Sequence, residues 1–191
     1  MNRKDITKLL INTLISTRLS DRKYYAKEVT LDYGTNHSKR IDVVQFEPSG
    51  VTYAGDIEKG TFTCYEIKSC KEDVYSGNGL RFYGERNYIV TTMDCYKDLQ
   101  EDLRDGNFWK YLKENYPESS THIGIMVLVP DSIDVKNSDD MFTEFENPTS
   151  LDKDIRWKLA IINQCRPGPR VRSTTELLFC MLRAKHSATN N

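Results

Sequence analysis

Residues 64–74 read CYEIKSCKEDV, and they join what reads as a buried strand to a polar turn. Glu66 and Lys68 stand on either side of Ile67, so the two-residue period of a strand places both charges on one face. That face begins with apolar side chains and ends with charged ones. Burying unpaired charges costs free energy, so this strand end is either a solvated edge or part of a site that compensates the charges with an ion.

A second acidic residue favours the interpretation of this strand end as an ion-binding site. Residues 40–44 read RIDVV, which sets Asp42 inside an apolar strand, and alternation places Asp42 on the same face as Val44. If this strand pairs with the one that carries Glu66, the two carboxylates converge on one hard cation, for which Mg²⁺ or Mn²⁺ is suitable. Lys68 would then lie beside the metal and assist the attack of water on a phosphodiester. We therefore predict Asp42 and Glu66 as metal ligands, and Asp42, Glu66 and Lys68 as catalytic residues.

The remaining chain has the pattern of an α/β protein with a mixed central sheet flanked by helices. We expect one domain over residues 1–191, ending in a disordered tail at about 187–191. The expected helices cover residues 4–19, 93–116 with a break near Gly106, 150–165, and a last helix from Ser173, whose STTE sequence is a capping box. The expected strands cover residues 24–33, 39–48, 60–69, 86–92 and 121–130.

The composition excludes several classes of protein. The net charge of −1 provides no global positive field, so a nucleic-acid site must be local. No apolar run is long enough to span a bilayer, and the N-terminus does not read as a signal peptide, so we expect a cytoplasmic protein without a membrane partner. The five cysteines form no C-x-x-C pair, which argues against a zinc site or a disulfide framework.

The segments RIDVV and CYEIKS together resemble the D…E-x-K signature of the PD-(D/E)xK nuclease-like superfamily, whose restriction-endonuclease-like core is an αβββαβ fold. With LRFYGERNYIV, HIGIMVLV and the final LLFCMLRAK, most of the chain resembles the MmcB-like DNA-repair nuclease-like family and its small phage-encoded relatives. The resemblance implies Mg²⁺-dependent hydrolysis of nucleic acid, with DNA as the expected partner.

The resemblance also implies roles for individual positions. It assigns metal binding to Asp42 and Glu66 and catalysis to Lys68, and it makes Glu28, Ser69 and Asp73 candidate supporting residues. Asp73 equally fits the cap of a turn. The chain departs from the family in three places. Ile41 stands where the nominal motif has proline, and residues 77 and 79 are glycines where an acid and a lysine are common. The expected helix from Cys95 to Tyr116 is also longer than the corresponding connection of the family.

Basic residues near the RPGPR turn are candidate nucleic-acid contacts, namely Arg166, Arg170 and Arg172. Two alternatives to a nuclease stay open. One is a non-catalytic module on the same fold, encoded by a phage or mobile element, that binds nucleic acid or protein. The other is an unrelated α/β domain in which the EIK triplet marks only a surface edge.

Overall fold

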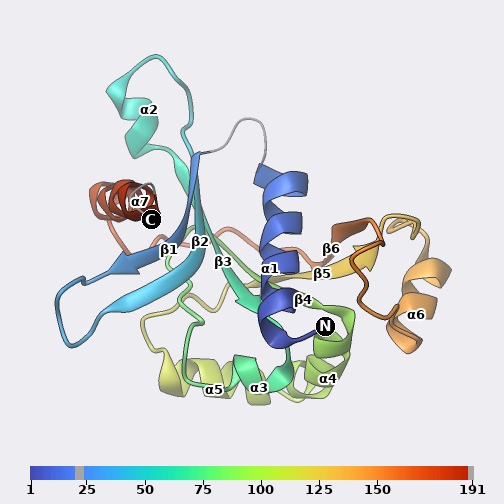
Figure 1. Cartoon of the computed structure of the whole chain (residues 1–191). Helices are drawn as coiled ribbons and strands as arrows, with labels where there is room; N and C mark the ends of the chain where they lie inside the picture. Colours follow the sequence, from blue (N-terminus) through green and yellow to red (C-terminus); the bar gives the residue numbers. More distant parts are fainter. Residues whose placement is uncertain (20–23, 189–191) are drawn as a thin grey trace.

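A computed structural model of the chain describes residues 1–19 and 24–188, with the backbone alone for 185–188 (Figure 1). The helices and strands, in chain order, are α1 (Arg3–Leu14), the π-helical turn η1 (Ile15–Leu19), β1 (Tyr24–Leu31), β2 (Lys39–Glu47), α2 (Ala54–Glu58), β3 (Thr61–Lys68), α3 (Lys71–Val74), β4 (Arg86–Thr92), α4 (Met93–Arg104), α5 (Asn107–Asn115), β5 (Gly124–Pro130), α6 (Ser138–Glu146), β6 (Trp157–Asn163) and α7 (Thr174–Ala188).

Within the described residues, six strands form one sheet in the order β1-β2-β3-β4-β5-β6. The first three strands are antiparallel neighbours, as a meander of β-branched and aromatic runs predicts. Strands β3, β4 and β5 are parallel, and β6 closes the far edge antiparallel to β5. Because parallel strands are usually buried on both faces, β5 reads GIMVLVP with every residue buried.

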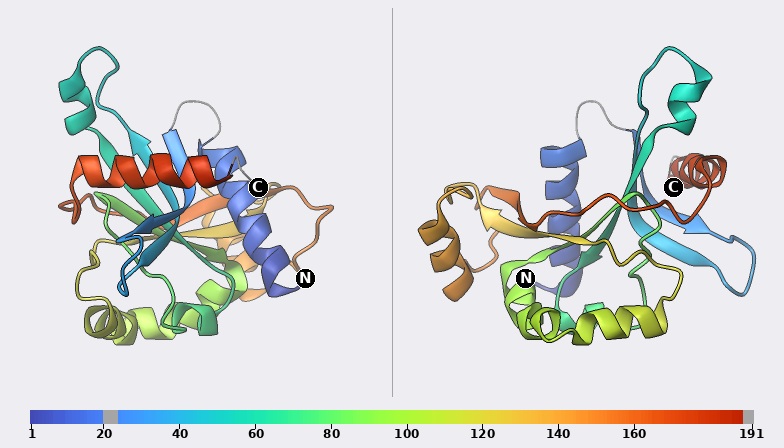
Figure 2. Two further views of the ribbon diagram at one scale, coloured as in Figure 1. Left: turned by 60° about the vertical axis from the view of Figure 1, so that its left-hand side comes forward. Right: turned by 180° about the vertical axis from the view of Figure 1, so that it is seen from behind.

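Helices cover both faces of the sheet (Figure 1). The apolar stripe of α1 packs on one face, against residues such as Tyr65, Val90 and Leu128. On the other face α7 covers β1 and β2, and α3, α4 and α5 enclose a separate cluster around Ile89. Two further views show α1 and α7 on opposite sides of the strands and α2 at the end of a projecting arm (Figure 2).

The predicted mixed α/β class is confirmed, and the order α1, β1, β2, β3, α3, β4 follows the expected αβββαβ sequence of elements. The predicted break in the helical run occurs at Gly106, which has a φ of 83° and separates α4 from α5. The predicted cap of the last helix is also present, since the Ser173 hydroxyl accepts a hydrogen bond from the Glu176 backbone N–H at 3.2 Å. Residues 189–191 of the predicted tail lie outside the described residues, and α7 extends to Ala188.

The predicted helix over residues 150–165 is wrong, because residues 157–163 form β6. Its apolar residues fit helical spacing, but β5 offers a free backbone edge that a further strand can satisfy with ladder hydrogen bonds. Leu159 pairs with Leu128 and Ala160 with Val127 along that edge. The sequence analysis also missed α2 and α6, which are short helices within stretches expected to be connections.

Side-chain alternation breaks in the two strands next to the predicted site. Ile41 and Val44, although three residues apart, both lie in the cluster beneath α7, as does Val29, the pairing partner of Ile41. The phase changes at Glu28, which has a φ of 53°, and at Asp42. The expectation of strict alternation along β2 is therefore wrong before Val44, and Asp42 lies between Ile41 and Val43, where the alternation changes phase.

Among the described residues, none of the helices is both long and apolar enough to cross a membrane.

Candidate functional site

The end of β3 carries two buried charged residues. Glu66 is 0% exposed and Lys68 is 3% exposed. Tyr65 and Ile67 pack toward α1, whereas Phe62 and Cys64 pack in the cluster beneath α7, so the alternation predicted for this strand holds. The surface-edge alternative does not fit, because a solvated edge would leave both charged side chains in water.

Asp42 is held against this strand end by a hydrogen bond. The β2–β3 ladder reaches Val43, which pairs with Tyr65, and Asp42 is the next residue of β2. Its Oδ2 accepts a hydrogen bond from the Ile67 backbone N–H at 2.8 Å. The carboxylate thus satisfies a backbone donor at the point where the two strands separate, and this contact fixes its position beside Glu66.

The two carboxyl groups influence each other. Burial, and after it the charge of Asp42, raise the pKa of Glu66 to about 8 against the opposing charge of Lys68. Burial also raises the pKa of Asp42, opposed by the hydrogen bond from Ile67 and by the charge of Lys68. A paired arrangement of this kind favours either a retained proton or a bound cation.

The Glu66 carboxyl has one satisfied and one unsatisfied oxygen. Oε1 accepts a hydrogen bond from the Arg81 backbone N–H at 3.0 Å, whereas Oε2 is buried and has no hydrogen-bond partner among the described residues. Gly79, with a φ of 102°, lies directly over this oxygen: a Cβ there would be 2.6 Å from Glu66 Oε2 and 2.5 Å from Lys68 Nζ. A side chain at this position would displace the two charged groups and strain the backbone, so the close approach favours glycine.

A polar pocket of about 520 Å³ opens beside these residues. Asp42 and Lys68 line it, and Lys68 Nζ donates a hydrogen bond to the Asn78 carbonyl oxygen at 2.7 Å across one wall. Glu66 lies beneath the lining. The lining comes from α1, the β1–β2 hairpin, the end of β3, α3 and the segment after α3. It consists of Thr7, Thr30, Ser38, Lys39, Arg40, Asp42, Ile67, Lys68, Asp73, Gly77, Asn78, Gly79 and Arg81.

Two of the three candidate supporting residues are near this pocket. Asp73 lines it, and Asp73 Oδ2 accepts hydrogen bonds from the backbone N–H and the hydroxyl of Ser69, both at 3.3 Å. Asp73 also forms an ion pair with Arg3 at 3.4 Å. Both residues therefore shape the turn after β3. The candidate role of Glu28 is not supported, because Glu28 is exposed on β1 outside the pocket lining.

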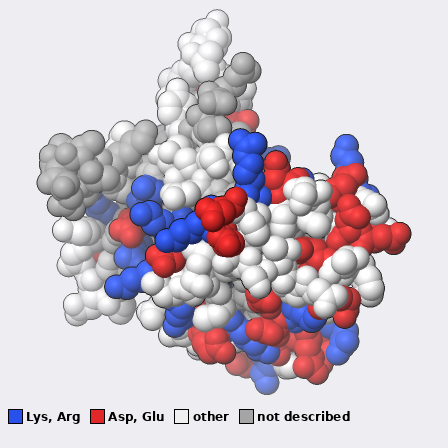
Figure 3. All heavy atoms as spheres, turned by 45° about the vertical axis from the view of Figure 1, so that its right-hand side comes forward, with Lys and Arg blue, Asp and Glu red and all other residues white. Residues whose placement is uncertain are grey.

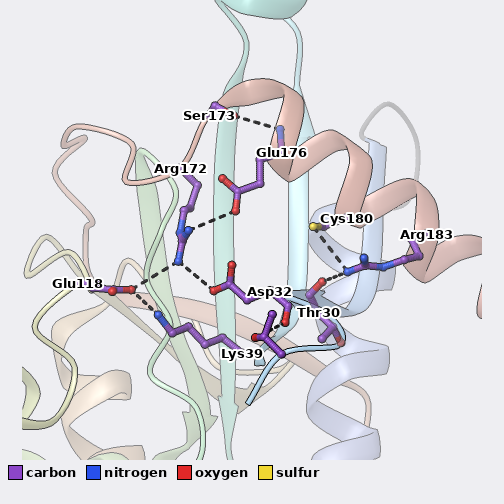
Figure 4. Close-up of polar contacts among 10 residues, drawn as sticks. Thr30, Asp32, Lys39, Glu118, Arg172, Ser173, Glu176, Cys180 and Arg183 are labelled. Atoms are coloured by element: carbon purple, nitrogen blue, oxygen red, sulfur yellow. Dashed lines mark hydrogen bonds and ion pairs between the residues drawn. The ribbon is translucent and has the colours of Figure 1, made fainter. Parts of the chain in front are cut away.

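The arginines proposed as nucleic-acid contacts do not line the pocket either. Arg172 forms ion pairs with Asp32 at 3.2 Å, Glu118 at 3.5 Å and Glu176 at 3.3 Å (Figure 4). Arg170 pairs with Glu85 at 3.2 Å. These carboxylates neutralise charges that the sequence left available for phosphate.

Arg166 differs from the other two because it is exposed and joins no ion pair among the described residues. It follows β6 and is likewise absent from the pocket lining. The predicted nucleic-acid contacts at Arg166, Arg170 and Arg172 thus lie outside the pocket, and the contact at Arg166 stays a prediction.

Sequence reasoning missed the residues contributed by the irregular segment after α3, above all Gly79 and Arg81. The sequence signal for this segment was the run VYSGNGLRFYGE at residues 74–85, which contains three glycines and lies between two expected strands. Such a run predicts a connecting loop. Its conformation includes positive φ values at Gly77, Gly79 and Leu80. No local pattern places such a loop over a particular glutamate.

The residues present fit a hard divalent cation. No group of three or more His, Cys, Asp or Glu side chains arranged to hold a metal is found in the described part of the chain. Asp42 and Glu66 provide two carboxylates, one with an unsatisfied oxygen, and Mg²⁺ is commonly bound by one or two carboxylates with water and substrate phosphate completing its shell. Zinc, which favours nitrogen and sulfur ligands, does not fit this donor set.

Comparisons with protein-family models, with curated proteins and with solved structures gave no match for the chain. The functional assignment therefore depends on the geometry of the site.

Proposed function

We propose that this protein is a nuclease that hydrolyses phosphodiester bonds with Mg²⁺ or Mn²⁺. The observation that carries the proposal is the pair of carboxyls on adjacent strands, the half-buried Asp42 and the buried Glu66, with Lys68 beside them at the wall of a polar pocket. Each group alone would be costly to bury, and together they form the donor set of a divalent-metal phosphodiesterase.

Each of the three residues has a distinct role in this proposal. Asp42 and Glu66 would hold the cation, which supplies Lewis-acid stabilisation of negative charge on phosphate when it is bound. Asp42 keeps its orientation through the Ile67 N–H, and Glu66 through the Arg81 N–H. Lys68, held by the Asn78 carbonyl, would direct its ammonium toward the pocket, where it orients the attacking water and stabilises the charge that develops on phosphate.

The element order and the D…E-x-K spacing support membership of the PD-(D/E)xK superfamily. Under this proposal the partner is nucleic acid, with DNA expected, and the location is cytoplasmic. The MmcB-like resemblance extends the proposal to DNA repair, or to a phage-encoded DNA-processing role.

One observation favours the alternative of a non-catalytic binding module on the same fold. Glu66 is fully buried and does not line the pocket, so a cation can reach its Oε2 only if the segment around Gly79 moves. In a binding module, Glu66 would retain its proton and serve only the packing of that segment. The two functions differ in whether metal binds and whether phosphodiester bonds break.

A cleavage assay with labelled DNA distinguishes the nuclease from the non-catalytic binding module. Purified protein should cut DNA in Mg²⁺ or Mn²⁺ and not in EDTA, and Glu66→Gln, which keeps the side-chain shape, should lower the rate by about 100-fold or more. Glu101→Gln is the matched control, because Glu101 is exposed on α4 away from the pocket. Cleavage by Glu66→Gln at the rate of the control would refute the assignment.

A further inference from the structure

The cationic side chains that line the pocket are not all neutralised. Lys39 pairs with Glu118, and Lys68 is held by a backbone carbonyl. Arg40 and Arg81 also line the pocket, and neither joins an ion pair among the described residues. They contrast with Arg172, which has three carboxylate partners.

Arg40 is placed by the strand that also carries Asp42. It is the second residue of β2, it pairs with Thr30 of β1, and it is exposed at the rim of the pocket. Arg40 and Asp42 both line this pocket. The two side chains nevertheless form no ion pair, so the guanidinium donors are available to an incoming anion.

Arg81 is placed by contacts on both its backbone and its side chain. Its backbone N–H donates to Glu66, and its guanidinium carbon lies 4.5 Å from the centroid of the Tyr116 ring. Stacking on an aromatic ring restricts the arginine side chain while its N–H donors stay free to bind phosphate. Arg81 is thus held at the pocket without a carboxylate partner.

The described lining of the pocket offers no aromatic platform on which a base could stack. No aromatic side chain is among its described lining residues, and Tyr116 beneath Arg81 is buried. The remaining polar groups include the hydroxyls of Thr7, Thr30 and Ser38. Aromatic platforms are typical of binding to single-stranded bases, whereas arginines and hydroxyls are typical contacts to the phosphate backbone.

We propose that Arg40 and Arg81 bind the phosphate backbone of the nucleic acid on either side of the site formed by Asp42, Glu66 and Lys68, without reading its sequence. This inference rests on the proposed function and adds the residues that hold the substrate. It moves the nucleic-acid contact from the RPGPR turn to the rim of the pocket. The face shown in Figure 3 has acidic and basic side chains interspersed, as expected if binding depends on a local site instead of a broad basic surface.

The test measures the binding of two short labelled DNA duplexes of unrelated sequence, in EDTA so that neither metal nor cleavage contributes, over a range of salt concentrations. Arg40→Gln and Arg81→Gln should each weaken binding to both duplexes and reduce the slope of log affinity against log salt by about one. Arg86→Gln is the matched control, because Arg86 is an exposed arginine at the start of β4 outside the pocket.

The outcomes separate this inference from the proposed function. Unchanged slopes in both pocket variants, or an equal fall in Arg86→Gln, would overturn the inference even if the wild-type protein cleaves DNA. A smaller slope of log affinity against log salt in Arg40→Gln and Arg81→Gln, but not in Arg86→Gln, would support the inference even if the wild-type protein did not cleave DNA. A loss confined to one of the two duplexes would contradict backbone binding and indicate sequence reading.

Discussion

Glu66 is the residue on which the proposed chemistry depends, and its protonation would distinguish a metal-free site from a metal-bound one. A carboxyl with a pKa of about 8 keeps its proton at neutral pH in the absence of a cation. A cation at Asp42 and Glu66 would displace that proton, because metal ligands must be deprotonated. Metal affinity should therefore rise with pH as Glu66 becomes easier to ionise.

The raised pKa of Glu66 also predicts how the stability of the metal-free protein changes with pH. In the unfolded chain Glu66 titrates near 4.5, and in the folded protein near 8. Between these values the folded state binds more protons, so its stability falls as pH rises, by up to about 1.4 kcal/mol per pH unit. Glu66→Gln has no proton to lose and should remove this slope.

Urea unfolding in EDTA at several pH values between 5 and 8 measures this dependence of the unfolding free energy on pH, with Glu101→Gln as the reference. The difference in unfolding free energy between Glu66→Gln and the reference should grow with pH. Parallel pH profiles for the two variants would contradict a raised pKa at Glu66.

The placement of Glu66 and Lys68 on one strand face could be predicted from the sequence, because the period of two residues holds along β3. Asp42 was singled out by its apolar context alone, since the alternation predicted for β2 fails there. The ion pairs of Arg170 and Arg172 could not be predicted in this way. Whether an arginine is free for phosphate depends on its partners, and Asp32 lies 140 residues from Arg172 in the sequence. Ion pairs over such separations leave no local pattern.

At the scale of elements, the segment between α3 and β4 completes the site. Gly77 and Gly79 both have positive φ values, of 79° and 102°, but a Cβ at Gly77 meets nothing within 4 Å, whereas one at Gly79 meets Lys68 and Glu66. Alanine at Gly77 should cost about 1 kcal/mol of stability through backbone strain alone. Alanine at Gly79 should cost more and should displace the charged pair.

Measurements of Mn²⁺ binding and DNA cleavage on Gly77→Ala and Gly79→Ala separate the effect of backbone strain from that of contact with Glu66 and Lys68. We expect Gly77→Ala to keep Mn²⁺ binding and DNA cleavage near wild-type values and Gly79→Ala to lose both. Equal activity in the two variants would show that the segment does not need to approach Glu66 closely.

The element boundaries show which local signals were sufficient. The capping serine of α7 and the glycine between α4 and α5 are short-range signals, and both were predicted. The β6 strand was mistaken for a helix because its apolar spacing fits either structure, and the free edge of β5 decided between them. Pairing with a distant strand is a tertiary effect that periodicity does not contain.

At the scale of the whole molecule, Arg172 connects three distant parts of the chain. Its carboxylate partners belong to the β1–β2 hairpin, the segment after α5 and the first turn of α7 (Figure 4). We predict that Arg172→Gln lowers the unfolding free energy by about 1 kcal/mol, because the pairs are partly exposed but form a network. Its affinity for DNA and its salt slope should equal those of the wild type.

Urea unfolding and DNA binding on the same preparation test this prediction. A variant that is as stable as the wild type but binds DNA less tightly would return Arg172 to the nucleic-acid surface. The opposite result keeps Arg172 as a structural link and leaves substrate binding to the pocket.

The central claim, that Asp42 and Glu66 share a divalent cation, is tested most directly by calorimetric titration of Mn²⁺ at pH 8. The wild-type protein should bind Mn²⁺, and Asp42→Asn should bind it at least about tenfold more weakly, since changes to outer-shell partners alone have effects of that size. Asp139→Asn, on the exposed first turn of α6, should bind like the wild type. Absence of Mn²⁺ binding in the wild type, or equal binding by Asp42→Asn, would contradict the claim.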